Sequence, residues 1–369
     1  MAGWLSTVEG LEIMSYHSFN PQFWKDKRVF ITGHTGFKGS WLSLMLKHCG
    51  ANVQGYSLEP LSNQKLFGIL ASAGETNNEW GDVRDLKNLT RCLSEFQPEI
   101  VFHLAAQSLV RESYKNPVET YNTNIMGTVN ILEAARLVKS VVAIVNVTTD
   151  KCYENQEMLW GYRENERMGG CDPYSSSKGC SEIITNAMRK SFFSDLGTAF
   201  VASARAGNVI GGGDWSNDRL IPDIINSLTN ETRVVLRNPK AIRPWQHVLD
   251  PLSGYMMLAE KLCTNNEQYA QAWNFGPTSE GVKPVAYIVE YMLQKWGKTE
   301  SWVLDPEEQP HEAQLLCLDI TKAMHELGWK PKWELTTTLD KTVDWYKAYA
   351  EGQDMYALSK KQISDYIMT

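Results

Sequence analysis

The chain of 369 residues has an ordinary globular composition, with 43% hydrophobic and 21% charged residues, which excludes a disordered, collagenous or coiled-coil protein. Its 43 acidic and 36 basic residues give a net charge of −7, and we therefore expect no nucleic-acid partner, because such a partner normally requires a basic excess. A chain of this length is expected to form one large domain with a smaller companion.

Residues 1–24 have no periodic pattern and are expected to form an N-terminal extension. They contain Glu9 and Glu12 but no Lys or Arg, so we do not expect a secretory signal. The longest apolar runs, such as 141–147, are far shorter than the ~20 residues that cross a bilayer, which predicts no membrane partner. The seven cysteines form no Cys-x-x-Cys pair, which indicates reduced thiols in a cytoplasmic protein. We expect no metal site.

From Lys27 onward, short β-branched runs alternate with long amphipathic segments. The pattern predicts strands at 28–32, 52–58, 99–104, 141–147 and 198–204, the last of which closes the series. Helices are expected at 37–49, around 118–138 and at 174–193. On the second helix one apolar stripe is formed by Val118, Tyr121, Ile125, Val129, Leu132 and Ala135. Continuous apolar strands separated by helices predict an α/β fold, a Rossmann-type doubly wound parallel sheet.

A glycine-rich loop, Thr32 to Gly39, lies directly between the first predicted strand and the first predicted helix. Gly33 and Gly36 allow a tight turn and a close approach to a pyrophosphate, and Gly39 allows close packing of helix against sheet. The free N–H groups of the helix start can then bind the anion. The spacing is G-x-x-G-x-x-G rather than G-x-G-x-x-G, so it is the strand–turn–helix context that favours a dinucleotide site over an ordinary glycine turn.

The choice between NAD and NADP is open at this point. An NAD site usually has an acidic residue after the second strand, but that region reads Gly55-Tyr56-Ser57-Leu58 and its first acid is Glu59. No Arg is present there to bind a 2′-phosphate. Asp82, followed by Val83, is a candidate for contact with the adenine end.

The segment that follows the predicted strand 141–147 contains Thr149, Asp150 and Lys151. In open α/β sheets, ligands bind outside the carboxyl ends of the strands. Thr149 can hydrogen-bond a reacting hydroxyl, and Asp150 can act as a general acid if burial raises its pKa. The alternative is a salt bridge between Asp150 and Lys151 in a loop.

A helix start is predicted at Asp172 as N-cap and Pro173 at the first helical position. Tyr174 and Lys178 are then one turn apart on the same face. An ammonium beside a phenol favours the phenolate, so we expect Lys178 to lower the pKa of Tyr174. On its own, this pair is equally typical of a solvated helix face.

The last third of the chain is interrupted by Gly211-Gly212-Gly213, Asn238-Pro239 and Gly276-Pro277. Such breaks predict shorter elements in a smaller, loop-rich lobe that presents side chains to a ligand. We therefore divide the chain into the extension 1–24, a dinucleotide-binding domain at 25–205 with a returning segment near 239–272, and a C-terminal substrate-binding lobe at 206–369.

In this order the motifs resemble the extended short-chain dehydrogenase/reductases, and within them the 4,6-dehydratases that act on CDP-D-glucose. The resemblance runs from about residue 24 to the C-terminus. It rests on the glycine loop with Ser40-Trp41, on Leu104-Ala105-Ala106-Gln107, on Thr149-Asp150 and on the Tyr174–Lys178 pair. More specific segments are 150–153, 160–166, 205–215 and 242–248.

The resemblance implies a lyase (a hydro-lyase) with NAD as cofactor. Such an enzyme oxidises C4 of the glucose, eliminates water across C5–C6 and reduces C6. The product, CDP-4-keto-6-deoxy-D-glucose, feeds deoxysugar biosynthesis for lipopolysaccharide O-antigen. By the same resemblance, Tyr174 is the base for the 4-hydroxyl, Thr149 holds that hydroxyl, and Asp150 protonates the departing 6-hydroxyl.

The family also implies contacts around these groups. The cofactor is expected to touch Gly33, Thr35, Gly36, Phe37, Lys38, Gly39, Asp82, Val83, Leu104, Ala105, Ala106, Gln107, Tyr174 and Lys178. Asn208 and Arg243 match positions that bind the pyrophosphate of the sugar nucleotide. Arg219 and His311 are further substrate-binding candidates, although each is as typical of a solvated surface. A homodimer is expected to form through the helices around 118–138 and 174–193.

Lys151 departs from the wider dehydratase pattern, in which a Glu at this position is the C5 base. A lysine can be a base only if its amine is neutral, which requires a lowered pKa. Lys151 can instead orient Asp150 or stabilise the enolate, so the identity of the C5 base is open.

Two other functions compete with dehydration. A sugar-nucleotide 4-epimerase of the same fold shares the glycine loop and the Tyr174–Lys178 pair, but it needs no acid for a 6-hydroxyl. A cofactor-sensing binding protein needs no hydride-transfer base, so Thr149, Tyr174 and Lys178 together argue against it.

Overall fold

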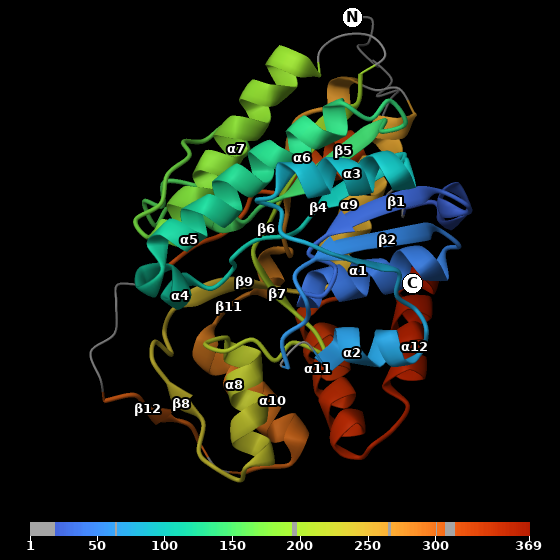
Figure 1. Ribbon diagram of the computed structural model, residues 1–369. Coiled ribbons are helices and arrows are strands. Elements are labelled where there is room, and N and C mark those ends of the chain that lie inside the picture. The colour runs from blue at the N-terminus through green and yellow to red at the C-terminus, as the bar shows by residue number, and fades with distance from the viewer. Residues whose placement is uncertain (1–18, 63–64, 194–197, 265–266, 300, 307–313) are drawn as a thin grey trace, which may run out of the picture.

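The computed structural model describes residues 19–62, 65–193, 198–264, 267–299, 301–306 and 314–369 (Figure 1). Most of the expected extension 1–24 lies outside them. Seven strands form one sheet in the order β10-β6-β5-β4-β1-β2-β3, and all six neighbouring pairs are parallel. Their bounds are β1 Arg28–Thr32, β2 Asn52–Ser57, β3 Asn78–Trp80, β4 Ile100–His103, β5 Ala143–Val147, β6 Phe200–Ala206 and β10 Ala272–Phe275. The Rossmann-type doubly wound sheet is confirmed.

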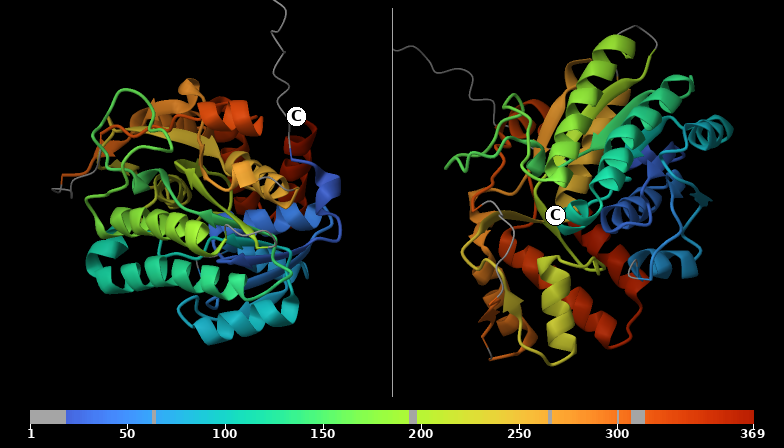
Figure 2. Two further views of the ribbon diagram at one scale, coloured as in Figure 1. Left: turned by 90° about the horizontal axis from the view of Figure 1, so that it is seen from above. Right: turned by 60° about the vertical axis from the view of Figure 1, so that its left-hand side comes forward.

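Both faces of the sheet are covered, which explains why its strands are continuously apolar. In β1, Phe30 joins one buried cluster while Val29 and Ile31 join the other, because successive side chains of a strand point to opposite faces. One face is packed by α3 Leu86–Phe96, α6 Gly127–Arg136 and α7 Pro173–Phe192, and the other by α1 Phe37–His48 and α9 Leu249–Cys263 (Figure 2). The site described below lies at the carboxyl ends of these strands.

The long predicted helix around 118–138 is present, but it contains a π-turn. It is built from α5 Pro117–Tyr121, the π-turn Asn122–Met126 and α6. The predicted stripe is not uniformly buried: the side chain of Val118 is 77% exposed, whereas Leu132 and Ala135 are buried. A π-turn adds a residue to one turn, so a stripe with regular spacing moves from the outer face to the core as it passes through it.

The sheet does not close at Ala204, because β10 from the last third of the chain pairs with β6. The last third is also less broken than its glycines and prolines predict. The breaks fall between elements, and the four helices α9, α10 Val285–Trp296, α11 Leu335–Ala350 and α12 Met355–Met368 have 15, 12, 16 and 14 residues. None of the described helices is long and apolar enough to span a bilayer.

Two small sheets lie beside the large one in the last third of the chain. The first orders β11 Val282–Pro284, β9 Ile242–His247 and β7 Asn208–Ile210, and the second pairs β12 Val303–Leu304 with β8 Val235–Leu236. The remaining helices longer than one turn are α2 Lys65–Ser72, α4 Val110–Lys115 and α8 Leu220–Thr229. Strand β7 follows directly after β6, so the first small sheet begins at the carboxyl end of the large one.

Candidate active site

The glycine loop forms a close-packed cradle between β1 and α1. Gly33 has a φ of +74°, and a Cβ atom built there would lie 2.6 Å from the backbone nitrogen of Ala105. A Cβ atom on Gly39 would lie 2.2 Å from the carbonyl oxygen of Gly33. Gly36 is the N-cap of α1, and the first N–H groups of a helix have no partner within it. The cradle therefore fits a pyrophosphate, and with it a dinucleotide cofactor.

Lys38, in the first turn of α1, points into a cluster of cations. Burial lowers the pKa of its amine to about 7, helped by the charges of Arg219, Lys178 and Lys151 and opposed by Asp150. The structure thus brings a residue of the predicted cofactor loop together with the predicted catalytic residues. A bound pyrophosphate would supply the negative charge that this cluster lacks.

The residues near the predicted adenine end of the cofactor site are held by hydrogen bonds within the protein. Thr35 accepts a hydrogen bond from Ser57 at the end of β2 at 3.2 Å. Asp82 is bound by Arg84, whose hydrogen bonds are the main reason that the pKa of Asp82 is lowered. Val83 is buried, and its carbonyl accepts from Asn130 at 2.9 Å.

The segment from Leu104 to Gln107 lies against the cradle. Leu104 donates to the carbonyl of Thr32, and the nitrogen of Ala105 donates to the Thr32 hydroxyl at 3.2 Å. The Gln107 side chain donates to Thr120 at 2.9 Å and accepts from the Leu109 nitrogen at 2.6 Å. Ala105 and Ala106 therefore follow the glycine loop closely, whereas the Gln107 amide is engaged in holding its own loop.

Helix α7 begins as predicted, with Asp172 as N-cap accepting from the Ser175 nitrogen at 2.9 Å. Tyr174 and Lys178 are both buried, at 8% and 6% exposure. The Lys178 amine donates to the carbonyl of Val147, the last residue of β5, at 3.3 Å. This contact holds the helix face against the strand end from which the other catalytic candidates follow.

The expected lowering of the Tyr174 pKa is wrong for the protein without ligands. Burial raises the pKa of Tyr174 to about 12, against the opposing effects of a hydrogen bond with Thr149 and the charge of Arg219. Burial also lowers the pKa of Lys178 to about 8. Sequence spacing placed the two groups correctly but could not weigh desolvation, which disfavours the charged form of both.

Thr149, Asp150 and Lys151 lie at the carboxyl end of β5. The Thr149 hydroxyl donates to Asp150 Oδ1 at 2.9 Å, and the Lys151 amine lies 3.3 Å from the same oxygen. Asp150 is fully buried, and its Oδ2 atom has no hydrogen-bond partner among the described residues. The predicted salt bridge between Asp150 and Lys151 is therefore present. Thr149 also connects Asp150 to Tyr174, because it forms a hydrogen bond with each of them. Oδ2 is therefore the carboxyl oxygen that no described side chain engages.

The sugar-nucleotide candidates come from later segments. Asn208 and Arg243 lie on the neighbouring strands β7 and β9. Asp150 is close to this small sheet, because a Cβ atom on Gly207 would meet Pro244 at 2.7 Å and Asp150 Oδ2 at 3.1 Å.

Arg219 precedes α8 and connects Asp214 to Ser108, each at 3.1 Å. Its charge also acts on Lys38 and Tyr174, which places it with the predicted cofactor and catalytic residues. His311 lies outside the described residues.

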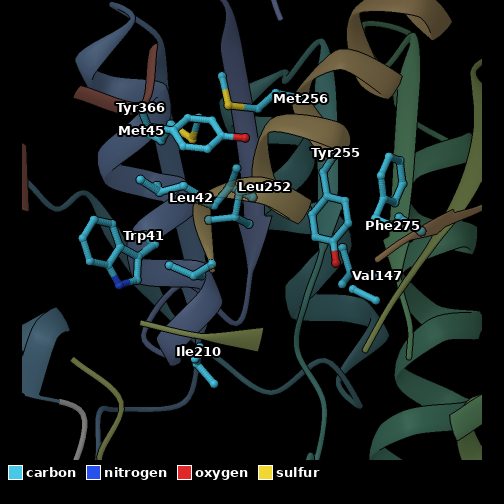
Figure 3. Close-up of a cluster of buried hydrophobic side chains, with 14 of the residues drawn as sticks. Trp41, Leu42, Met45, Val147, Ile210, Leu252, Tyr255, Met256, Phe275 and Tyr366 are labelled. Atoms are coloured by element: carbon cyan, nitrogen blue, oxygen red, sulfur yellow. The ribbon is translucent and has the colours of Figure 1, made fainter. Parts of the chain in front are cut away.

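Two groups beneath the site were missed from the sequence. Glu182, one turn beyond Lys178, is buried with Arg205 from the end of β6 at 2.8 Å. Tyr255 of α9 projects toward Val147 (Figure 3), and its buried hydroxyl has no hydrogen-bond partner among the described residues. The spacing of Tyr174, Lys178 and Glu182 at intervals of four residues was a visible signal for the first group. No local signal existed for Tyr255, which comes from a distant helix.

Within the described ranges, no group of three or more His, Cys, Asp or Glu side chains could hold a metal ion. The groups that the structure brings together beside the dinucleotide cradle are a phenol, an amine, a carboxyl and a hydroxyl.

Comparison with known proteins gives the same picture. The model of the family described as GDP-mannose 4,6 dehydratase matches residues 30–342. A CDP-glucose 4,6-dehydratase of Salmonella typhimurium is 54% identical over 349 residues, covering 94% of this chain and 97% of the relative. A dTDP-glucose 4,6-dehydratase of the same organism is 26% identical, covering 87% and 93%. The resemblance inferred from the motifs is confirmed.

Solved structures share the fold. A dTDP-glucose 4,6-dehydratase from Streptomyces venezuelae, solved with NAD, superposes with a TM-score of 0.76 at 23% identity, covering 89% of this chain and 99% of the other. A UDP-glucose 4-epimerase from Thermotoga maritima, solved with UDP-glucose, gives 0.76 at 21% identity, covering 88% and 99%. Fold similarity alone therefore does not separate dehydration from epimerisation.

Proposed function

The chain belongs to the GDP-mannose 4,6 dehydratase family, and from this premise we propose that it dehydrates CDP-D-glucose to CDP-4-keto-6-deoxy-D-glucose with NAD as cofactor. The choice of substrate is supported by the Salmonella relative, which is similar over nearly the whole of both chains. We further propose that the product feeds deoxysugar biosynthesis of the lipopolysaccharide O-antigen type.

The observation that carries the proposal is the position of Asp150. A 4-epimerase needs the phenol and the hydroxyl, but it needs no proton donor for a 6-hydroxyl. Here the buried Asp150 is joined to Thr149, and Thr149 in turn to Tyr174, while one carboxyl oxygen stays without a partner among the described residues. A carboxyl in this place gives the site the acid that elimination requires.

Each residue then has a defined role. Tyr174 accepts the proton of the 4-hydroxyl, and Thr149 hydrogen-bonds that hydroxyl. Asp150 Oδ2 gives a proton to the 6-hydroxyl, which leaves as water. The C5 proton passes to a base at the position of Lys151, where the wider dehydratase pattern has Glu. NAD would be held by the cradle from Gly33 to Gly39, where it would supply a hydride acceptor for C4 and, once reduced, a hydride donor for C6.

The contact of Lys151 with Asp150 also supports an orienting role for this lysine. Its amine lies 3.3 Å from Asp150 Oδ1, so it fixes Oδ1 and leaves the other carboxyl oxygen, Oδ2, out of this contact. Removal of this contact as Lys151→Met should slow elimination and leave C4 oxidation in place.

The nucleotide is held by cations from separate segments. Arg219 and Arg243 supply guanidinium groups, whose paired donors match phosphate oxygens, and Asn208 lies on the strand beside Arg243. The cradle at Gly33 to Gly39 holds the cofactor pyrophosphate.

We also propose that the protein is a cytoplasmic homodimer. The dimer is supported by apolar side chains on the outer face of adjacent helices: Val118, Tyr121 and Met126 on α5 and the π-turn, and Ile183 on α7, are 77, 37, 44 and 58% exposed. Such a patch on neighbouring helices suits a four-helix contact between two copies. The compartment is supported by the seven cysteines, all of which are free thiols.

A single incubation tests the activity. The protein is incubated with CDP-glucose and NAD, and the molecular mass of the product is measured by mass spectrometry. Loss of one water supports dehydration. An unchanged mass with altered stereochemistry supports epimerisation instead, and no turnover supports a sensing protein. The matching test of the dimer is light scattering of Val118→Glu beside the parent protein.

A further inference from the structure

Helix α7 presents three ionisable groups along one face. Tyr174, Lys178 and Glu182 follow one another at intervals of four residues, which places them one above the next on a helix. All three are buried, with Glu182 at 4% exposure. The first two have roles in the proposed function, and the third has none.

Both oxygens of the Glu182 carboxylate are fixed from the sheet. Oε1 accepts a hydrogen bond from the Thr148 hydroxyl. Oε2 accepts from the Ser203 hydroxyl at 2.7 Å and from Arg205 Nη2 at 2.8 Å. Thr148 directly precedes Thr149, so Glu182 ties the catalytic end of β5 to the helix that carries Tyr174.

Arg205 is held as firmly as its partner. Its Nη1 atom donates to the Tyr153 hydroxyl at 2.7 Å and to the Glu164 carbonyl at 3.0 Å. The Arg205 and Glu182 side chains are both 4% exposed. An ion pair buried to this degree needs hydrogen bonds on its remaining atoms to offset desolvation, and most of them are present here.

The charge of Glu182 acts on Lys178. Burial pushes the pKa of Glu182 up, but the charge and hydrogen bond of Arg205 outweigh it and leave that pKa below its ordinary value. Burial lowers the pKa of Lys178 to about 8, and the charge of Glu182 is the strongest effect that opposes it. The other ionisable groups that face Lys178 or Glu182 are Lys38, His103, Cys152 and Arg189.

These observations support one role for Glu182, and this role rests on the proposed function. We propose that Glu182 is a positioning residue of the hydride-transfer site: fixed by Arg205, it supplies the negative charge that keeps Lys178 an ammonium, and it holds Thr148 so that Thr149 faces Tyr174. An ammonium one turn away favours the phenolate form of Tyr174 and opposes the burial that raises the pKa of this phenol to about 12. The phenolate accepts the proton of the 4-hydroxyl.

Glu182→Gln separates charge from shape. The amide can still accept from Thr148, but the negative charge is gone, so Lys178 loses its proton at lower pH. The alkaline limb of the pH–rate profile of C4 oxidation, followed in a single turnover, should move down by about 1 pH unit, the low end of what removal of a nearby opposite charge gives.

Three matched variants test whether the shift comes from the lost charge or from a lost hydrogen bond. Glu182→Asp keeps the charge and withdraws the carboxylate from Thr148, so the limb should stay while the rate falls. Thr148→Val should behave in the same way, because it removes the hydrogen bond and no charge. Ser203→Ala removes a hydrogen bond to the same carboxylate and should leave the limb in place. A limb that is unchanged in Glu182→Gln overturns the proposal.

Glu182→Gln leaves Arg205 as an unpaired buried charge, which is costly. If that variant does not fold, Glu182→Gln with Arg205→Gln removes both charges and should show the same shift. A wild-type limb in a folded double variant likewise contradicts the proposed role.

A measurement without cofactor completes the test. Trace acetylation of the protein across a pH series, read on the peptide that contains Lys178, reports when that single amine loses its proton, independently of Lys38. It should titrate about 1 pH unit lower in Glu182→Gln than in the parent. If the parent protein does not dehydrate CDP-glucose, the proposed function fails, whereas an unshifted amine in an active enzyme contradicts only the role of Glu182.

Discussion

The two ends of the site are built in different ways. The proposed dinucleotide end uses backbone groups from one short segment, Gly33 to Gly39. The shape of this segment depends on its glycines, because a Cβ atom at Gly33 or Gly39 would clash with neighbouring backbone. The proposed sugar end would use side chains from separate segments: Thr149 and Asp150, Tyr174, Arg219 and Arg243. A backbone site depends on the steric fit of one loop, whereas a side-chain site depends on charges and burial that only the folded chain creates. Substitutions at the two ends should therefore fail in different ways.

The largest effect is expected from Tyr174→Phe, at the sugar end. The ring and its packing remain, and only the proton acceptor is lost, so kcat should fall by about 10²–10⁴-fold. The unfolding free energy should stay near that of the parent. Steady-state kinetics and denaturant unfolding measure both, with Tyr287→Phe on α10 as a control for loss of a half-exposed hydroxyl. Loss of stability equal to the loss of rate would place Tyr174 with the structural residues.

Asp150→Asn should affect one half of the reaction. The amide can still accept from Thr149 but cannot deliver a proton to the 6-hydroxyl. Elimination should slow by about 10²-fold or more, while C4 oxidation changes little. In single-turnover experiments the absorbance of reduced nicotinamide should therefore accumulate. Asp344→Asn, on the exposed side of α11, is the control. Equal slowing of both steps would remove Asp150 from the acid role.

At the dinucleotide end, two glycines form a matched pair. Gly33→Ala should cost about 1–3 kcal/mol of unfolding free energy even without cofactor, because its φ is +74° and its Cβ atom would meet Ala105 at 2.6 Å. Gly36→Ala should cost less than about 1 kcal/mol, since its φ is −71° and its nearest contact is 3.4 Å.

Gly33→Ala and Gly36→Ala each add a Cβ atom to the loop that would hold the pyrophosphate, so both should weaken NAD binding in calorimetry. The comparison between the two ends requires that Gly33→Ala alone loses stability in the absence of NAD. Similar losses in both variants would show that the loop is held by packing other than the contact of Gly33 with Ala105.

The sequence predicted the strand, the glycine loop and the helix of the proposed dinucleotide end, because these three elements are consecutive. It also placed Tyr174 and Lys178, since a helix fixes the spacing of its own residues. It could not give the direction in which the pKa of Tyr174 shifts, because burial decides it. It also could not predict the contact of Glu182 with Arg205, because this contact joins a helix to a strand. The π-turn after Tyr121 was equally invisible, because one added residue in a turn leaves no mark in a regular apolar pattern.

The smallest effect is expected at the nucleotide-binding arginines. Arg243→Lys should raise KM for CDP-glucose about tenfold, or ~1.4 kcal/mol, because an ammonium cannot form paired hydrogen bonds with a phosphate. Arg219→Lys should raise KM less, since Asp214 and Ser108 already hold this side chain at 3.1 Å each and a lysine can retain one of these contacts. In both variants kcat should change little. Arg91→Lys, on α3 across the sheet, should change neither constant. If Arg219→Lys instead lowers kcat more than it raises KM, the shape of the guanidinium at this position matters for the reaction at Tyr174, and the sugar end extends to α8.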